Sequence, residues 1–257
     1  MYKIISDSAC DLSKKYIAEH DITIVPLSVS FDGETYYRDS IDISRDECYE
    51  RMVSNPGVYP KTSLPSVDSY YNAFKEFTDK GIPVVCFTIT LIFSGSYNSA
   101  MNAKEMIEEE NPDANITVID SKQNTVTQAL IIDQMVRMRD AGISFEDSLK
   151  KLEPLMASAR IFFTVGSLDY LKMGGRIGKL ASIASKIDVK PVIIMKDGDI
   201  SLGGIGRNRN KLKAKVLSTA KAYLDENGKD NFVVSVGYGY DKTEGVSFMN
   251  DVEETLG

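Results

Sequence analysis

Two serines flank a glycine at Ser94-Gly95-Ser96, where a strand-like run passes into a helical pattern. At such a junction, side-chain hydroxyls lie beside helix N-terminal amides that have no partner within the helix. These amides and the positive end of the helix dipole attract anions, so the residues predict a binding site for a carboxylate or a phosphate. The alternative is that both serines only cap the helix, a common role for serine.

A second hydroxyl pair, Thr62-Ser63, stands between Pro60 and Pro65 and just before another helical pattern. The two prolines restrict the backbone on either side of the pair. On its own the pair is also explained as a cap or a turn. Together with the first corner, it could bind the two oxygens of one carboxylate or phosphate group.

Asp7 and Asp120 each end a strand-like run and precede a serine. Carboxylates at strand ends can bind Mg²⁺, which defines a rival hypothesis: a Mg-dependent phosphotransferase or phosphohydrolase that uses these two residues. The simpler interpretation is that each aspartate accepts hydrogen bonds from loop amides. Three arginines in glycine-rich or turn-like surroundings could bind a phosphate or a partner's carboxylate: Arg176, Arg207 and Arg209.

The remaining residue types exclude several kinds of site. The chain has one histidine, His20, in a helix-end context, so a Ser-His-Asp triad and a multi-histidine zinc site are not supported. The three cysteines are far apart and form no CxxC motif. Gly174–Leu180 is one residue short of a P-loop, so nucleotide binding is weakly supported. We therefore predict no metal and no cofactor.

Composition places the chain among ordinary globular proteins. Of its 257 residues, 43% are hydrophobic and 26% charged, with a net charge of −7. No basic stripe suggests nucleic acid as a partner. The longest near-apolar stretch, Ile82 to Phe93, is too short to span a membrane, which leaves only transient membrane contact. The N-terminus has no signal-peptide pattern, so we predict a cytoplasmic protein.

The elements that must position these residues alternate between strand and helix patterns, typical of an α/β fold with a largely parallel sheet. This pattern defines a predicted N-terminal domain, residues 1–159, with flanking helices. Its predicted strands are Tyr2–Ser6, Ile22–Ser30, Pro83–Thr90 and Asn115–Ile119. Its main predicted helices begin at a Ser44 capping box, after Ser66, after Phe93, at Thr125 and at Phe145.

The pattern changes near Arg160, where we place the start of a smaller C-terminal α/β domain with a mixed sheet, residues 160–257. Its predicted strands are Arg160–Val165, a hairpin of Val189–Met195 with Ile200–Ile205, and Phe232–Val236. Its predicted longer helices are Asn208–Leu224 and Thr243–Thr255. The fold class is therefore two-domain α/β.

An ordered set of motifs covers roughly Met1 to Gly206, and through it the sequence resembles the DegV family of bacterial fatty-acid-binding proteins. This family includes the lipid-carrier subunits of fatty acid kinase. The motifs are Ser6-Asp7-Ser8, Val25-Pro26-Leu27, Tyr37-Arg38-Asp39, Thr62–Ser66, Ser94–Ala100, Val118–Ser121, Leu168–Ile177 and Lys190-Pro191-Val192.

The resemblance implies a carrier, not itself an enzyme, that holds a long-chain fatty acid such as palmitate between two domains. Thr62 and Ser94 would bind the carboxylate with help from the amide of Gly95, and Ser63 and Ser96 complete the candidate set. A partner kinase would phosphorylate the bound carboxylate. By resemblance Arg176, with Arg207 or Arg209, would face that partner or the acyl phosphate. A protein-binding adaptor without a lipid-sized cavity is a third hypothesis.

Three positions depart from the family pattern. Family members usually have Thr where this chain has Ser96, and a histidine after the strand near Val236 where this chain has Gly237–Asp241. They also usually carry a Gly-Pro-Gly segment with another histidine, whereas this chain stops at Gly257. We expect these departures to affect the interaction with the kinase more than lipid binding.

Overall fold

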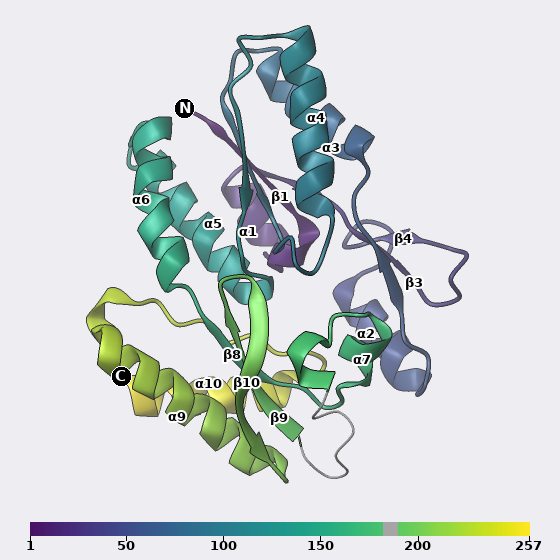
Figure 1. The fold of residues 1–257 in the computed structure, drawn as a ribbon, viewed down its shortest axis with the longest axis vertical. Coiled ribbons are helices and arrows are strands. Elements are labelled where there is room, and N and C mark those ends of the chain that lie inside the picture. Colours follow the sequence, from purple (N-terminus) through teal and green to yellow (C-terminus); the bar gives the residue numbers. More distant parts are fainter. Residues whose placement is uncertain (182–189) are drawn as a thin grey trace. The chain divides into compact units, whose positions relative to one another are not determined.

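The computed structural model describes residues 1–181 and 190–257 (Figure 1). They form two compact units. The first consists of Met1–Cys48 with Pro60–Ala159, and the second of Tyr49–Tyr59 with Arg160–Gly257. The segment Tyr49–Tyr59 thus groups with residues more than a hundred positions later, an association that no local sequence pattern indicates.

A four-stranded parallel sheet forms the centre of the first unit. Its strand order is β2-β1-β6-β7, and every residue of the two middle strands is buried. Strands buried on both faces are expected to be near-continuous apolar runs, and β6 lies within such a run. The strands are β1 (Lys3–Asp7), β2 (Ile22–Val25), β6 (Val84–Thr88) and β7 (Ile116–Asp120).

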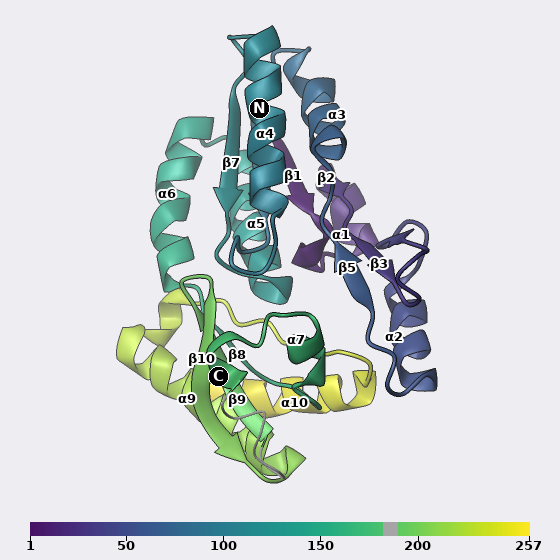
Figure 2. The ribbon, with the colours of Figure 1, turned by 45° about the vertical axis from the view of Figure 1, so that its right-hand side comes forward.

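Helices cover both faces of this sheet (Figure 2). Because side chains alternate along a strand, Ile4 packs into one apolar cluster and Ile5 into the other. The cluster with Ile4 includes side chains of α5 and α6, and that with Ile5 includes side chains of α3 and α4. The helices are α1 (Lys14–Glu19), α3 (Val67–Thr78), α4 (Ser96–Glu110), α5 (Thr125–Asp140) and α6 (Phe145–Ser158), and a short 3₁₀ turn, η1, spans Ser8–Cys10.

Serine side chains cap three of the helices that the sequence predicted. Ser44, Ser66 and Ser144 each accept a hydrogen bond from the backbone N–H three residues later, at 3.1 Å. Ser44 precedes α2 (Arg45–Ser54), which begins in the first unit and ends in the second. The sequence therefore predicts these three helix starts correctly.

The single strand predicted over Ile22–Ser30 is wrong, because the run breaks at Pro26. Proline has no N–H to continue the ladder with β1. The chain leaves the parallel sheet there, and β3 (Ser28–Ser30) joins a separate antiparallel sheet of order β4-β3-β5. Its other strands are β4 (Tyr37–Arg38), which follows a bend at Asp32-Gly33, and β5 (Lys61–Ser63), which no sequence pattern predicted.

The second unit contains an antiparallel sheet of order β10-β9-β8 among its described strands. The predicted hairpin turns at Asp197-Gly198, where both φ angles are positive, at 52° and 86°. Its predicted first residue, Val189, lies outside the described residues. The elements are β8 (Ile161–Thr164), α7 (Asp169–Met173), η2 (Gly178–Leu180), β9 (Lys190–Lys196), β10 (Asp199–Gly206), α9 (Arg209–Asn227), η3 (Lys229–Asn231) and α10 (Lys242–Leu256).

The strand predicted over Phe232–Val236 is absent from the described structure. Its alternating apolar residues have strand propensity, but none of the described strands pairs with it. Val233 and Val234 are 57% and 47% exposed instead of facing a core. A strand needs a partner for its N–H and C=O groups, so propensity alone did not suffice here.

Candidate functional site

The Ser94-Gly95-Ser96 corner lies where the loop after β6 enters α4. The Ser96 backbone N–H donates to Ser94 Oγ at 3.2 Å, and the two hydroxyl oxygens are 2.9 Å apart. Ser94 is half-buried, whereas Ser96 is fully buried. The first turn of this 15-residue helix carries no acidic side chain, so its own residues do not neutralise the positive end of its dipole. The arrangement can bind an anion through Ser94 and the helix start.

Two aspartates hold the loop that leads to this corner. Asp7 Oδ2 accepts the backbone N–H of Ile89 at 2.8 Å, and Asp7 Oδ1 accepts Gln128 Nε2 at 2.9 Å. On β7, at the other side of β6, Asp120 Oδ1 accepts the backbone N–H of Leu91 at 3.2 Å. Burial raises the pKa of Asp7 to about 6. Both carboxylates therefore act as anchors of the loop between β6 and α4.

The magnesium hypothesis finds little support in this geometry. Both oxygens of the Asp7 carboxylate already accept hydrogen bonds, and Asp120 also accepts the Lys122 N–H at 3.0 Å. Among the described residues, no group of three or more His, Cys, Asp or Glu side chains is placed to hold a metal ion. The capping and turn role is the interpretation that the contacts favour.

Thr62 and Ser63 lie in β5, opposite Val29 and Ser28 of β3, and both are exposed. Of the two interpretations of this pair, a helix cap does not fit the structure, because the helix cap is Ser66, three residues beyond Ser63. The segment contacts the Ser94-Gly95-Ser96 corner through Leu64, because a Cβ on Gly95 would lie 3.3 Å from Leu64 Cδ2. The structure thus brings together the Ser94 corner and the segment next to Thr62.

The three candidate arginines belong to the second unit. Arg176 is exposed and donates from Nη1 to the Gly174 carbonyl. Arg209 makes a two-pronged contact with Glu244, at 2.8 and 2.7 Å, which lowers the pKa of that carboxyl. Arg207 is exposed. The role of each toward a ligand or a partner stays a prediction.

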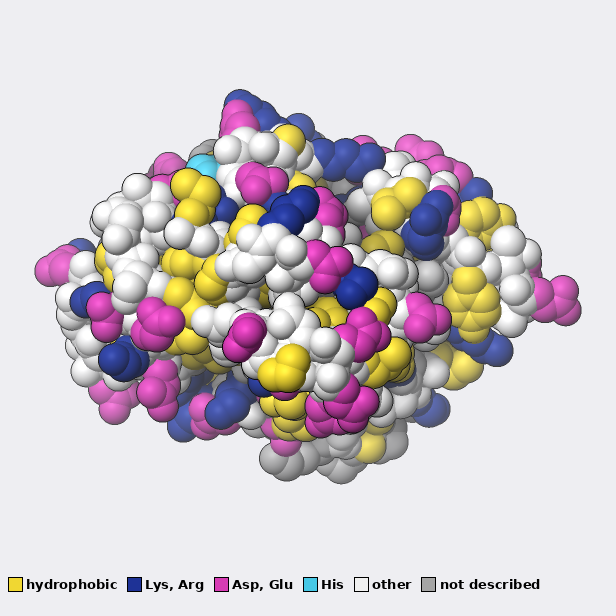
Figure 3. Space-filling view, turned by 90° about the horizontal axis from the view of Figure 1, so that it is seen from above, with side chains coloured by type: hydrophobic (Ala, Val, Ile, Leu, Met, Phe, Trp, Pro, Cys, Tyr) yellow, Lys and Arg dark blue, Asp and Glu magenta, His cyan; other side chains and the backbone are white. Residues whose placement is uncertain are grey.

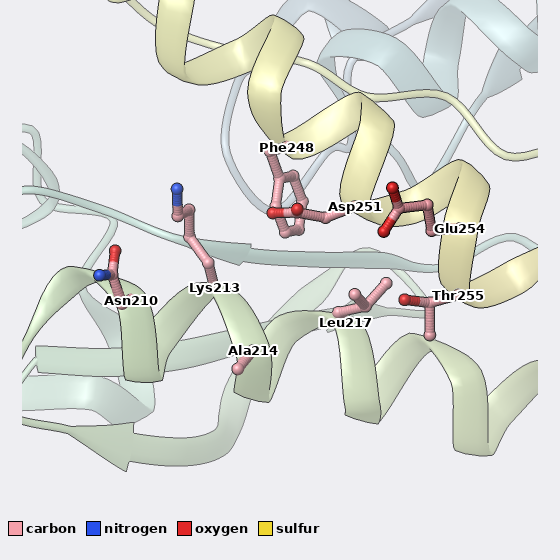
Figure 4. A pocket seen from close by; sticks show the side chains of 8 residues that line it. All are labelled: Asn210, Lys213, Ala214, Leu217, Phe248, Asp251, Glu254 and Thr255. Atoms are coloured by element: carbon pink, nitrogen blue, oxygen red, sulfur yellow. The ribbon is translucent and has the colours of Figure 1, made fainter.

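A separate hollow of about 300 Å³ lies between α9 and α10 in the second unit (Figure 4). Its lining includes Leu217 and Phe248 with one cation, Lys213, and two acids, Asp251 and Glu254. The two acids disfavour a carboxylate ligand. None of the candidate site residues predicted from the sequence lines this hollow.

One face of the molecule carries charges of both signs. On the face shown in Figure 3, Lys and Arg side chains are interspersed with Asp and Glu side chains. None of the helices in the described part of the chain is long and apolar enough to cross a membrane.

Sequence reasoning missed two residues at the corner, Leu64 and Tyr70. Tyr70 is fully buried on α3, near Ser96, and its hydroxyl has no hydrogen-bond partner among the described residues. The only sequence signal was the place of Tyr70 on the apolar face of a helix, which fits a core residue equally well.

Comparison with known proteins identifies the family. Residues 1–255 match the family model described as "Uncharacterised protein, DegV family COG1307". The chain belongs to the DegV family. It is 32% identical over 208 residues to the DegV domain-containing protein SA1258 of Staphylococcus aureus (strain N315), covering 80% of this chain and 72% of that relative.

Several solved structures share the fold. A stearic acid-binding protein from Eubacterium ventriosum is 73% identical, with a TM-score of 0.97 over 100% of this chain and 88% of that one. A DegV family protein from Thermus thermophilus, described by its fatty acid binding, is 26% identical with a TM-score of 0.77, covering 87% and 78%. The Streptococcus pneumoniae Fatty Acid Kinase (Fak) B3 protein, loaded with linoleic acid, is 25% identical with a TM-score of 0.73, covering 89% and 79%.

Proposed function

We propose that this DegV protein binds a long-chain fatty acid and holds its carboxylate with Thr62, Ser94 and the amide of Gly95. The observation that carries the proposal is the corner itself: a half-buried hydroxyl at the start of a long helix whose first turn has no acid. It is supported by the description of the 73% identical relative as a stearic acid-binding protein.

The chemistry of this corner suits a fatty acid. Hydroxyls and backbone amides donate hydrogen bonds to a carboxylate without a buried cation. Each buried methylene contributes roughly 0.8 kcal/mol, so the acyl chain supplies most of the affinity. The carboxylate contacts then orient the head group.

We further propose that the protein is a carrier subunit that presents the carboxylate to a partner kinase in the cytoplasm, and is not itself the catalyst. The relative described as the Fatty Acid Kinase (Fak) B3 protein supports this role. The exposed Arg176 and Arg207 are the candidate contacts to the partner or the acyl phosphate. Arg209 is a weaker candidate, because Glu244 engages two of its N–H groups.

Analysis of the lipid that accompanies the purified protein tests the ligand. After expression in a bacterial host, we expect native mass spectrometry and lipid extraction to reveal a co-purified acid of about sixteen to eighteen carbons. The reason is that a site for long-chain fatty acids would bind those of the host. A ligand-free spectrum, together with no uptake of added palmitate, contradicts the proposal.

A double variant tests the head-group contacts. Thr62→Val with Ser94→Ala removes two donors to a charged acceptor, so palmitate affinity should fall by roughly tenfold or more. The matched control is Thr243→Val with Ser247→Ala, two exposed positions on α10. Isothermal titration of delipidated protein measures the affinities, and circular dichroism checks the fold. Equal affinity in the test and control variants would show that these hydroxyls do not bind the head group.

A further inference from the structure

The sheet of the second unit has an open edge at β8. Among the described strands the order is β10-β9-β8, and β8 pairs only with β9. Val192, Ile193 and Met195 of β9 are fully buried, whereas all four residues of β8 are only partly buried. The backbone groups on the outer side of β8 therefore have no strand beside them in the described part of the chain.

A second stretch of unpaired backbone is Phe232–Val236, which follows α9. It consists largely of the β-branched and aromatic residues that favour strands. Phe232 N–H donates to the Lys229 carbonyl at 3.1 Å, but the backbone groups from Val233 to Val236 make no hydrogen bond to a described residue. The stretch thus has the composition of a strand and lacks the partner that a strand needs.

These two open edges, the outer side of β8 and Phe232–Val236, contact the same side chain of α9. The Tyr223 ring lies 5.8 Å from the ring of Phe162 in β8 and 5.6 Å from the ring of Phe232, measured between ring centroids. Neighbouring strands are about 4.8 Å apart, so two strands with a third between them are about 10 Å apart. Two rings that contact one tyrosine at these distances can be that far apart. The spacing fits one strand between the two open edges.

Neither open edge has the residues that keep exposed strands from pairing. Natural edge strands are commonly protected by charged side chains, above all lysine, or by proline. Ile161–Thr164 contains neither lysine nor proline, and the residues from Asn231 to Tyr240 include no charged residue and no proline. Such sequences are expected where another strand covers the edge.

The end of α10 indicates where this strand comes from. A Cβ on Gly257 would lie 3.5 Å from Lys229 Nζ, so α10 brings the chain back toward the start of Phe232–Val236. A helix that returns the chain in this way is the connection found in a βαβ unit. The Eubacterium ventriosum relative also has residues outside the match, which covers 100% of this chain and 88% of that one.

We propose that the second unit accepts one further β-strand between β8 and Phe232–Val236, and that a strand following α10 in longer relatives fills this place. The added strand forms main-chain hydrogen bonds on both of its sides, as in other cases of strand addition. An apolar strand fits best, because both open edges are uncharged. The inference is independent of the proposed function, since none of these residues is a candidate carboxylate contact.

Hydrogen exchange followed by mass spectrometry tests the proposal on two delipidated proteins. One is the 257-residue chain, and the other carries, after Gly257, the residues of the Eubacterium ventriosum relative that lie outside the match. In the shorter protein the amides of Val233–Val236 should exchange freely. In the lengthened protein these amides and the outer amides of β8 should exchange at least roughly a hundredfold more slowly, because pairing protects them.

Two controls separate strand pairing from a general effect of added residues. The same added residues in scrambled order should leave both open edges unprotected. Val234→Pro removes a backbone N–H and is not tolerated inside a sheet. It should abolish the protection in the lengthened protein, while the circular dichroism of the shorter protein stays unchanged. The added residues supplied as a free peptide to the 257-residue chain should protect the same amides, which repeats the test without altering the chain.

Slower exchange at both open edges, in the lengthened protein alone, is the expected result. Protection of neither edge, protection of one edge only, or equal protection by the scrambled residues overturns the proposal. Amides of Val233–Val236 that are already protected in the shorter protein also overturn it. Light scattering would then show whether a second copy of the chain supplies the strand.

Discussion

Burial and hydrogen bonding act in opposite directions on the Asp7 carboxylate. Burial raises its pKa, and the bonds from Ile89 N–H and Gln128 Nε2 lower it, with burial the larger effect, so that the pKa is about 6. No cation pairs with this carboxylate among the contacts of the described residues. A buried carboxylate without a cation costs free energy of folding, and such groups are concentrated at functional sites. Here the carboxylate of Asp7 anchors the loop that ends at Ser94.

The raised pKa predicts a pH-dependent contribution of Asp7 to stability. In the unfolded chain its pKa is near 3.9, so the stabilisation is fully present below that pH and is lost as the pH rises through about 6. The loss amounts to about 3 kcal/mol, because two pKa units are involved. The groups facing Asp7 keep their protons in this range, since burial raises the pKa values of Cys10, Cys86 and Tyr70.

Asp7→Asn cannot ionise and should remove this dependence. Relative to wild type, its free energy of unfolding should rise by about 2 to 3 kcal/mol between pH 4 and pH 7. Urea unfolding at several pH values measures the difference. The control is Asp113→Asn at an exposed position. Its free energy of unfolding should differ from that of wild type by the same amount at each pH. A flat difference for Asp7→Asn as well would mean that Asp7 has an ordinary pKa in the fold.

In the second unit, Gly245 of α10 packs against Tyr238, which lies in the extended segment before this helix. A Cβ at this buried glycine would lie 2.6 Å from Tyr238 Cγ and 2.8 Å from Tyr238 Cβ. These atoms are close to the backbone, so they cannot move aside without shifting the chain. The glycine is therefore required by close packing and not by a turn.

Gly245→Ala should destabilise the protein although alanine favours helices. The gain in helix propensity is roughly 1 kcal/mol, whereas overpacking typically costs about 1 to 3 kcal/mol. Chemical denaturation should show a net loss, and Tyr238→Gly, which removes every Tyr238 atom that the new Cβ would meet, should restore part of the stability when added to the variant. Gly166→Ala, where a Cβ meets nothing within 4 Å, is the control. A Gly245→Ala protein as stable as wild type would contradict the packing argument.

At the scale of the whole molecule, each unit has apolar packing of its own. The first has a cluster on either face of its parallel sheet, and the second has a smaller one around Val192, Leu212 and Val216. If a fatty acid binds only the folded chain, its binding free energy adds directly to stability.

We therefore expect delipidation to lower the melting temperature. Palmitate at a hundredfold its Kd should restore about 2.7 kcal/mol of stability, which corresponds to a shift of roughly 5 to 10 °C for a chain of this size. Differential scanning calorimetry measures it. At the same palmitate concentration, the Thr62→Val with Ser94→Ala variant should shift less. An identical melting temperature with and without palmitate would contradict ligand binding to the native state.

Local patterns in the sequence determined the elements that depend on nearby residues. The buried runs at β1 and β6 and the serine caps at Ser44, Ser66 and Ser144 were predictable, because periodicity and capping act within a few residues. The Ser94-Gly95-Ser96 corner was predictable for the same reason: its hydroxyls are two positions apart.

Only the tertiary structure decided the contacts between distant segments. Asp7 accepts the N–H of Ile89, 82 residues away, and Thr62 pairs with Val29 in an unpredicted strand. The predicted strand at Phe232–Val236 is absent because none of the described strands lies beside it as a partner. Propensity is a property of a short segment, whereas a hydrogen bond between segments exists only when packing places both partners together.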